Sequence, residues 1–497
     1  MTGFIYAISG GKAALAQDAQ VSANLRRMVG SGILVAVGYI DPGNWATDIA
    51  GGSGFGYGLL MVVITSAFLA LGFQILVSRL ALATGQDLAT LTARHLPARW
   101  SKAAWLAGEA AILATALAEL IGGAIALRLL FDLPLIAGVA VTGVGTFAVL
   151  ALTRGNADRH ERVIAVLLGV VAASFVFLLF KANPAWTAVA HGVTETGRAL
   201  RNPQGFLIAL GILGATLMPH NLYLHSGSLA ERAQSLPSSA RGMAMRVARN
   251  DTIVSLGVAM LINSAIMIVA AASLSGSGLI VSSLDDAHAV IAHNLGIGAA
   301  VVFAVALYAA GQSSTITGVL AGRILSKGFQ IRSNWSDRRR ALATRLIAGA
   351  AAVGLLIFTG GKDPDELLVL SQVILSLALP FALGPLVVLA CRKGVMGQYA
   401  LRGAWAWAAI SATVGIVIPG RLPAGRHGGL GQKKRQRLLA FFCLPLAPLW
   451  RRAGSRLSGR RRRPDAAFDP RPCRAELRRQ RRQTRPRAPS GAATGHG

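Results

Sequence analysis

Apolar stretches long enough to cross a lipid bilayer recur along the chain, and they constrain its fold more than any other feature. A hydrocarbon core of about 30 Å requires about 20 predominantly apolar residues in a helix. The composition agrees, because 53% of the 497 residues are hydrophobic and 14% are charged. A soluble domain has about 25% charged residues. We therefore predict an all-α integral membrane protein.

The apolar stretches predict ten membrane spans and leave an eleventh open. The first 20 residues lack a basic segment leading into a cleavable apolar core, so we expect no signal peptide and treat 1–27 as an N-terminal segment. The membrane core then covers 28–391. Its spans are 28–51, 57–82, 104–130, 133–153, 162–181, 204–228, 251–275, 295–322, 342–360 and 366–391, and the eleventh would be 403–419.

The distribution of basic residues predicts a cytoplasmic N-terminus. Before position 421 there are 29 Lys and Arg residues, and this orientation places 24 of them on the inner side and five outside. Basic loops remain on the cytoplasmic side of a membrane. We expect a multi-pass protein of the cell (inner) membrane, surrounded by lipid, whose oligomeric state the sequence leaves open.

Residues 421–497 form a strongly basic tail, with 21 Lys and Arg residues against three acids. Eleven spans would place this tail outside, against the charge rule. Three interpretations stay open: a cytoplasmic tail because 403–419 does not span, a basic arm that touches anionic lipid or nucleic acid, or a disordered product of a shifted reading frame. We favour the last, which needs no fold and explains why the final apolar stretch stops abruptly after Ile418.

Several function classes lack their motifs. The chain has no GxxxxGK[ST] stretch, which argues against an ATP-driven pump, and we expect neither an enzyme nor a resident cofactor. The three cysteines lie late in the chain and form neither a disulfide framework nor a CxxC pair. After Trp450 the tail has one aromatic residue, Phe468, so stacking platforms for nucleic acid are nearly absent.

Two of the apolar stretches are interrupted by a proline that an asparagine follows two residues later. The segments are 41–44 (DPGN) and 218–221 (MPHN). Proline removes a backbone donor and clashes with the preceding turn, so each helix breaks there. The breaks fall in spans 1 and 6, which divides the core into spans 1–5 and 6–10 with opposite topology. Inverted repeats with matching broken helices are typical of secondary transporters that bind substrate at the breaks.

The first break offers oxygen ligands. Pro42 opens the backbone ladder, Gly43 permits unusual backbone geometry, and carbonyl groups become available. Asp41 adds an anionic oxygen and Asn44 a neutral one. An ionisable group at this depth indicates an ion or proton path. The alternative is a kinked helix in which Asp41 pairs with a buried base.

The second break adds sulfur. Because Pro219 has no N–H, the Ala215 carbonyl loses its usual partner, and the Met218 thioether lies beside it in the sequence. Mixed oxygen and sulfur ligands suit transition metals, whereas magnesium and calcium prefer all-oxygen shells. A methionine in a membrane helix usually only packs, but the matching break at Asp41 favours a ligand here.

Other polar residues in apolar spans are candidates for a proton path. His220 and His225 differ in direction by about 140° on a helix, so both cannot face one metal. Either could relay protons or simply hold the unwound segment by hydrogen bonds. Glu119 is a better proton-path candidate than Glu109, which could pair with a positive partner. Gln372 could line the pathway or bond helices together.

The chain resembles the Nramp family over roughly 25–415. The resemblance rests on 38–47 (GYIDPGNWAT) and 214–226 (GATLMPHNLYLHS), supported by 310–318 (AGQSSTITG) and 370–373 (LSQV). It implies a leucine-transporter-like fold that carries manganese or ferrous iron inward, coupled to protons. The residues that it implies for the metal are Asp41, Asn44, Met218, the Ala215 carbonyl and, in some states, Gln372. His220 and Glu119 resemble the family's proton-linked residues.

The chain also departs from the family pattern. Ala116 stands where the family usually has an acid, and span 10 reads LALP at 377–380 instead of LQLP. The final helix and everything after Ile418 are expected to differ from the family. The neutral Ala116 leaves open a metal uniporter with altered proton coupling. An alternative of another class is a membrane-anchored sensor or nucleic-acid-binding protein that uses the basic tail.

Overall fold

The computed structural model describes residues 28–152, 157–234, 236–275, 283–330, 337–358 and 364–417. Throughout these ranges every regular element is a helix. The prediction of an all-α membrane protein is therefore confirmed. The predicted N-terminal segment 1–27 and the basic tail 421–497 lie outside the described residues.

The first half of the core begins with a broken helix, formed by α2 and α3, and continues with several long helices. Its elements are α2 (Ser31–Gly38), α3 (Pro42–Phe55), the 3-10 turn η1 (Gly56–Leu59), α4 (Leu60–Thr84), α5 (Leu88–His95), α6 (Ala98–Phe131), α7 (Leu135–Leu152) and α8 (Ala157–Ala182). The short helices α9 (Trp186–Thr194) and α10 (Thr196–Arg201) follow.

The second half begins with another broken helix. Its elements are α11 (Pro203–Thr216), α12 (Pro219–Ala233), the 3-10 turn η2 (Ser238–Ala240), α13 (Arg241–Leu274), α14 (Leu284–Leu295), α15 (Ile297–Gly328), α16 (Asp337–Phe358) and α17 (Pro364–Ala390). After them come α18 (Lys393–Met396), η4 (Gly397–Tyr399) and α19 (Gly403–Val417).

Helices coincide with all of the predicted spans, and pairs of half-helices coincide with the first and sixth. By length and apolar composition, seven helical stretches within the described residues can cross a membrane, and α7, α16 and α19 contain shorter apolar helices. The ten-span count stays a prediction. α6 and α13 begin at Ala98 and Arg241, ahead of the apolar stretches at 104 and 251, because polar residues can continue a helix beyond the lipid.

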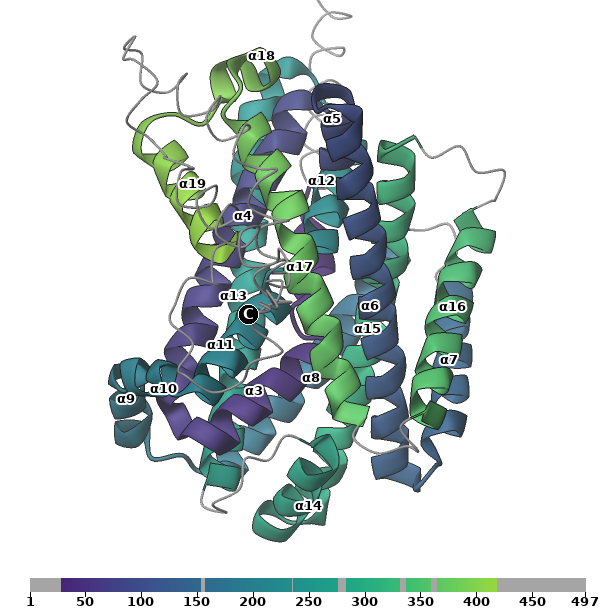
Figure 1. The fold of residues 1–497 in the computed structure, drawn as a ribbon, viewed down its shortest axis with the longest axis vertical. Coiled ribbons are helices and arrows are strands. Elements are labelled where there is room, and N and C mark those ends of the chain that lie inside the picture. The colour runs from purple at the N-terminus through teal and green to yellow at the C-terminus, as the bar shows by residue number, and fades with distance from the viewer. Residues whose placement is uncertain are drawn as a thin grey trace, which may run out of the picture. The chain divides into compact units, whose positions relative to one another are not determined.

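Short helices between the spans gather at two ends of the described core. Figure 1 shows α5 and α18 at one end and α9, α10 and α14 at the other. This alternation is what successive crossings of a membrane produce. α9 and α10 also fall in segment 183–203, which had no assigned span.

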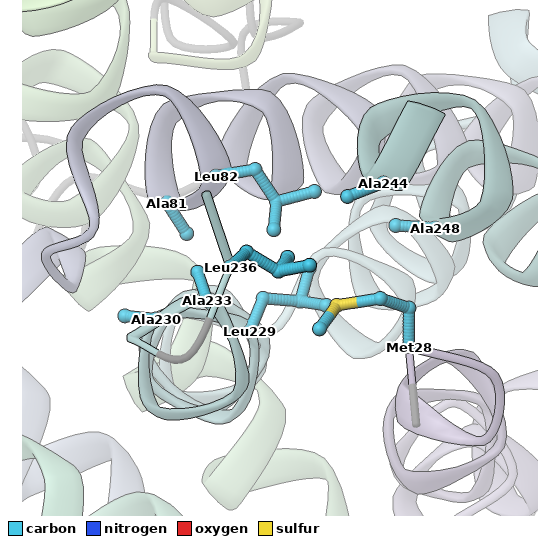
Figure 2. Close-up of a cluster of buried hydrophobic side chains, with 9 residues drawn as sticks. All are labelled: Met28, Ala81, Leu82, Leu229, Ala230, Ala233, Leu236, Ala244 and Ala248. Carbon is cyan, nitrogen blue, oxygen red and sulfur yellow. The ribbon is translucent and has the colours of Figure 1, made fainter. Parts of the chain in front are cut away.

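Close packing around the start of α2 holds the first half-helix in place. Met28 packs there with small and branched side chains from α4, α12 and α13 (Figure 2). Helices in lipid associate through van der Waals packing, which small residues improve by letting backbones approach. The cluster consists of Met28, Ala81, Leu82, Leu229, Ala230, Ala233, Leu236, Ala244 and Ala248. It joins the two halves of the core next to their broken helices.

Candidate functional site

The first break places a carboxylate at the start of a half-helix. α2 ends at Gly38, and Asp41 adopts an extended backbone with φ −73° and ψ 165°. Its Oδ1 accepts a hydrogen bond of 2.9 Å from the Asn44 backbone N–H and so caps α3. Pro42 occupies the first helical position, where no N–H is required. The Oδ2 of Asp41 and the Oδ1 of Asn44 are buried and have no hydrogen-bond partner.

The second break repeats this design. α11 ends at Thr216, Met218 is extended with φ −81° and ψ 120°, and Pro219 begins α12. Because Pro219 lacks an N–H, the Ala215 carbonyl receives no helical hydrogen bond from it. Ala215 and Met218 are both fully buried. Each proline therefore starts the second half-helix, and the residues just before it carry the free polar groups.

Glycines bring the two breaks into contact. A Cβ on Gly38 would overlap the Asn221 side-chain amide, so α2 touches the start of α12 at this position. Asn221 Nδ2 lies 3.6 Å from the Met218 sulfur. The end of the first half-helix is thereby placed beside the thioether of the second break.

A third helix completes the group. A Cβ on Gly43 would overlap the Gln372 side-chain amide of α17, and the Gln372 carbonyl lies against Gly214 of α11. The Oε1 of Gln372 is buried without a partner. The structure thus gathers the five residues predicted for the metal around the two breaks: Asp41, Asn44, Ala215, Met218 and Gln372.

The donors at this position suit a partly dehydrated cation. Asp41, Asn44 and Gln372 each have one buried oxygen atom without a partner, and the second break adds a thioether and a backbone carbonyl. Leaving such groups unpaired costs free energy, which a bound cation would recover. Within the described ranges no group of three or more His, Cys, Asp or Glu side chains could hold a metal. The arrangement therefore depends on amide, carbonyl and sulfur donors together with one carboxylate.

The two histidines of α12 face different helices, in line with their angular separation. His220 Nδ1 lies 3.5 Å from the Thr115 hydroxyl of α6. His225 Nδ1 lies 2.9 Å from Gln74 Oε1 of α4, and the Gln74 amide donates to the Tyr39 hydroxyl at 2.8 Å. His225 is thus joined to the first break through Gln74, whereas His220 lies toward α6.

Glu119 is a buried, paired carboxylate. It accepts hydrogen bonds from Ser314 at 2.8 Å and Thr315 at 3.1 Å, and Arg345 of α16 forms a salt bridge with it. The Ser314 and Thr315 hydroxyls therefore bond α15 to α6. Glu119 also interacts electrostatically with Asp41. Ala116, one turn earlier on α6, is buried and supplies no acid.

Three buried polar residues near the site were not among the predicted site residues. Arg345 is 5% exposed and pairs with Glu119, although its basic character placed it on the inner side of the membrane. Asn263 donates to the Tyr39 carbonyl at 2.8 Å and so supports the first break. Asp48 is buried in α3 with an unpartnered Oδ2. Each is a polar residue within an apolar span, and this placement was the available signal.

Known proteins resemble the chain over most of its length. The divalent metal cation transporter MntH of Brucella suis is 46% identical over 395 residues, which cover 78% of this chain and 86% of that protein. The crystal structure of a manganese transporter mutant from Eremococcus coleocola is 30% identical with a TM-score of 0.74, and the match covers 87% of this chain and 94% of that one.

A more distant structure shares only the fold. MhsT in complex with L-phenylalanine is 20% identical with a TM-score of 0.53, over 78% of this chain and 97% of that chain. These likenesses confirm the leucine-transporter-like fold.

The family comparison also corrects one expectation. The model of natural resistance-associated macrophage protein-like chains matches residues 32–420, so the last described helix, α19, lies within the match. The expectation that the final helix differs from the family was wrong, because its 15 residues are recognised although they are short for a span. The chain is therefore a member of the Nramp family of membrane transporters, which are not enzymes.

Proposed function

We propose that the chain imports divalent transition-metal ions, Mn²⁺ and Fe²⁺, together with protons, by alternating access around the two helix breaks. One observation carries this proposal: Asp41, Asn44 and Gln372 hold buried oxygens without partners, Gln372 lies against Gly43 of the first break, and the end of α2 touches Asn221, whose amide is 3.6 Å from the Met218 sulfur of the second break. The names of the Brucella and Eremococcus relatives, a divalent metal cation transporter and a manganese transporter, support it.

Each ligand has a distinct task in this proposal. Asp41 supplies the negative charge, while Asn44, Gln372 and the Ala215 carbonyl replace water oxygens around the ion. Met218 favours transition metals over magnesium and calcium because sulfur is a poor ligand for hard cations. Gln372 comes from α17, so relative movement of α17 and α3 would add or remove one ligand.

Protons would travel through buried ionisable groups next to the metal. In this proposal Asp41 binds both the metal and the proton. His220 and Glu119 continue the proton path toward α6, and His225 continues it toward α4. The salt bridge with Arg345 places a counter-charge beside Glu119 on this path.

A uniporter is the second candidate. Ala116 is buried and apolar, and Glu119 is already neutralised by Arg345. Because position 116 has no carboxylate and the Glu119 carboxylate is paired, proton flux could be lost while metal transport persists.

We also propose an orientation with the N-terminus in the cytoplasm of a cell whose inner membrane holds the protein. The short helices support it: α5 carries Arg94 and His95 in its last turn at the end of the core that this orientation places inside (Figure 1). Basic residues favour the cytoplasmic side.

The proposal is tested by Mn²⁺ uptake into sealed vesicles with the internal pH recorded at the same time. The unmodified chain should accumulate Mn²⁺ and acidify the lumen together. Asp41→Asn removes the charged ligand and should lower uptake by at least about a hundredfold, since loss of one partner of a buried charge pair costs about 3–5 kcal/mol.

Asp87→Asn is the matched control. Asp87 caps α5 through a 2.8 Å hydrogen bond from the Thr90 N–H, away from the breaks, and asparagine caps a helix equally well. Near-normal uptake by Asp41→Asn would refute the site. Mn²⁺ uptake by the unmodified chain without a pH change would establish the uniporter instead.

A further inference from the structure

Asp48 is a second buried carboxylate on the same half-helix as Asp41. Its side chain is 2% exposed, and its Oδ2 has no hydrogen-bond partner. It follows Asp41 by seven residues, so it lies on the same face of α3, about 20° from alignment and roughly 10 Å along the axis. An ionised carboxylate at this depth is costly unless a cation compensates it.

No counter-charge for Asp48 is found in the part of the chain that the structure describes. None of the salt bridges there involves it, and the charged group with which it interacts electrostatically is Asp41. The next turn of α3 packs through Gly52 against Met267, Ala270 and Ala271 of α13, which are apolar or backbone contacts. Two buried carboxyl groups therefore lie on one side of α3 without a protein cation between them.

The other groups near the proposed metal ligands do not supply the second negative charge that a dication needs. Glu119 is balanced by Arg345, Ala116 is neutral, and the histidines of α12 bond to Thr115 and Gln74. A divalent ion bound at Asp41 would carry two positive charges against one ligand charge. Asp48 would supply the second negative charge in a medium where water cannot.

We propose that Asp48 is the second counter-charge of the transported dication, acting through space while Asp41 ligates the metal. This inference rests on the proposed metal site at Asp41. Asp48 is a positioning residue in this role, because it stabilises the bound ion without touching it. Its effect depends on charge and not on the identity of the metal, whereas the effect of Met218 depends on the identity of the metal.

The size of the effect follows from electrostatics. At roughly 10 Å and an effective dielectric constant of about 20, one unit charge acting on a dication changes affinity by about a hundredfold, and by about tenfold if the effective dielectric constant is twice as large. Removing the charge should therefore weaken binding at least about tenfold.

The test is titration of the purified full chain with Mn²⁺ and with Cd²⁺, counting free Mn²⁺ by its electron paramagnetic resonance signal and bound Cd²⁺ by equilibrium dialysis. Asp48→Asn and Asp48→Ser should each raise both dissociation constants by the same factor of at least about ten. Asp48→Glu keeps the charge and should stay within about threefold of the unmodified chain. Ser53→Ala, a buried polar change on the same helix, should leave binding unchanged.

Two results would overturn the inference: neutral variants that bind within twofold of the unmodified chain, or Asp48→Glu losing as much affinity as Asp48→Asn. Where Asp48→Asn does not fold, Asp48→Ser supplies the same comparison. Asp41→Asn is measured alongside. If it binds normally, the proposed metal site fails; if it loses binding while Asp48→Asn does not, only the role of Asp48 fails.

Discussion

At the scale of single residues, the proposed site gives Met218 and Asp41 different roles: Met218 selects the cation and Asp41 holds it. Met218 lies 3.6 Å from Asn221 Nδ2, a weak partner that a metal could replace. Asp41 keeps one oxygen on the α3 backbone and the other free. A single carboxylate attracts any cation, so discrimination among divalent ions depends on the sulfur.

Met218→Ala should improve Ca²⁺ and Mg²⁺ access relative to Mn²⁺, because it leaves an all-oxygen shell. Competition of these ions against Mn²⁺ uptake in vesicles measures the change, and we expect Ca²⁺ to compete at least about tenfold better. Met267→Ala is the control, since both methionines are buried and pack against apolar side chains, but Met267 lies in α13 against α4 residues and not at a helix break. Both variants lose about 2–5 kcal/mol of stability by cavity formation. An unchanged selectivity in Met218→Ala would remove sulfur from the ligand set.

The sequence located the candidate ligands more readily than the residues that contact the site. Asp41, Asn44 and Met218 stand beside prolines in apolar stretches, and this local pattern indicates their roles. Arg345 is 226 residues from Glu119, and no local pattern links them. Asp48 follows Asp41 by seven residues and could have been found from the helical repeat.

At the scale of elements, the half-helices depend on close backbone approach. α2 and α12 approach at Gly38, α3 and α17 at Gly43, and α6 meets Pro42 at Gly122. Hydropathy located these helices but not their contacts, because residues far apart in the sequence form them. Hydropathy also missed where α6 and α13 begin, because a helix can extend beyond its apolar stretch.

Gly38→Ala should weaken Mn²⁺ binding by about tenfold without preventing insertion. The added methyl group overlaps the Asn221 amide and forces α2 away from α12, and overpacking of this kind costs about 1–3 kcal/mol. Titration of the purified chain with Mn²⁺ measures the loss. Gly257→Ala in α13 meets nothing within 4 Å and should bind Mn²⁺ normally. Equal binding by the two variants would show that this contact does not shape the site.

At the scale of the whole molecule, the lipid is the reason that so much of the fold was predictable. A backbone in a bilayer must satisfy its own hydrogen bonds, so each apolar stretch can only be a helix unless something breaks it. The two prolines then mark the first span of each half of the core. The order of helices in space was not predictable from hydropathy, because α6 packs against α15 and α17 from the other half of the chain. The family match ends at residue 420, and the interpretation of the basic tail stays a prediction.

The most direct test of the central claim, that the two helix breaks form one transition-metal site, is anomalous X-ray scattering from crystals of the chain soaked in Mn²⁺. We predict a single strong peak in coordination contact with Asp41, Asn44, the Ala215 carbonyl and Met218. In Asp41→Asn crystals treated in the same way, this peak should disappear. A strong Mn²⁺ peak elsewhere in the core, with neither Asp41 nor Met218 among its ligands, would contradict the account.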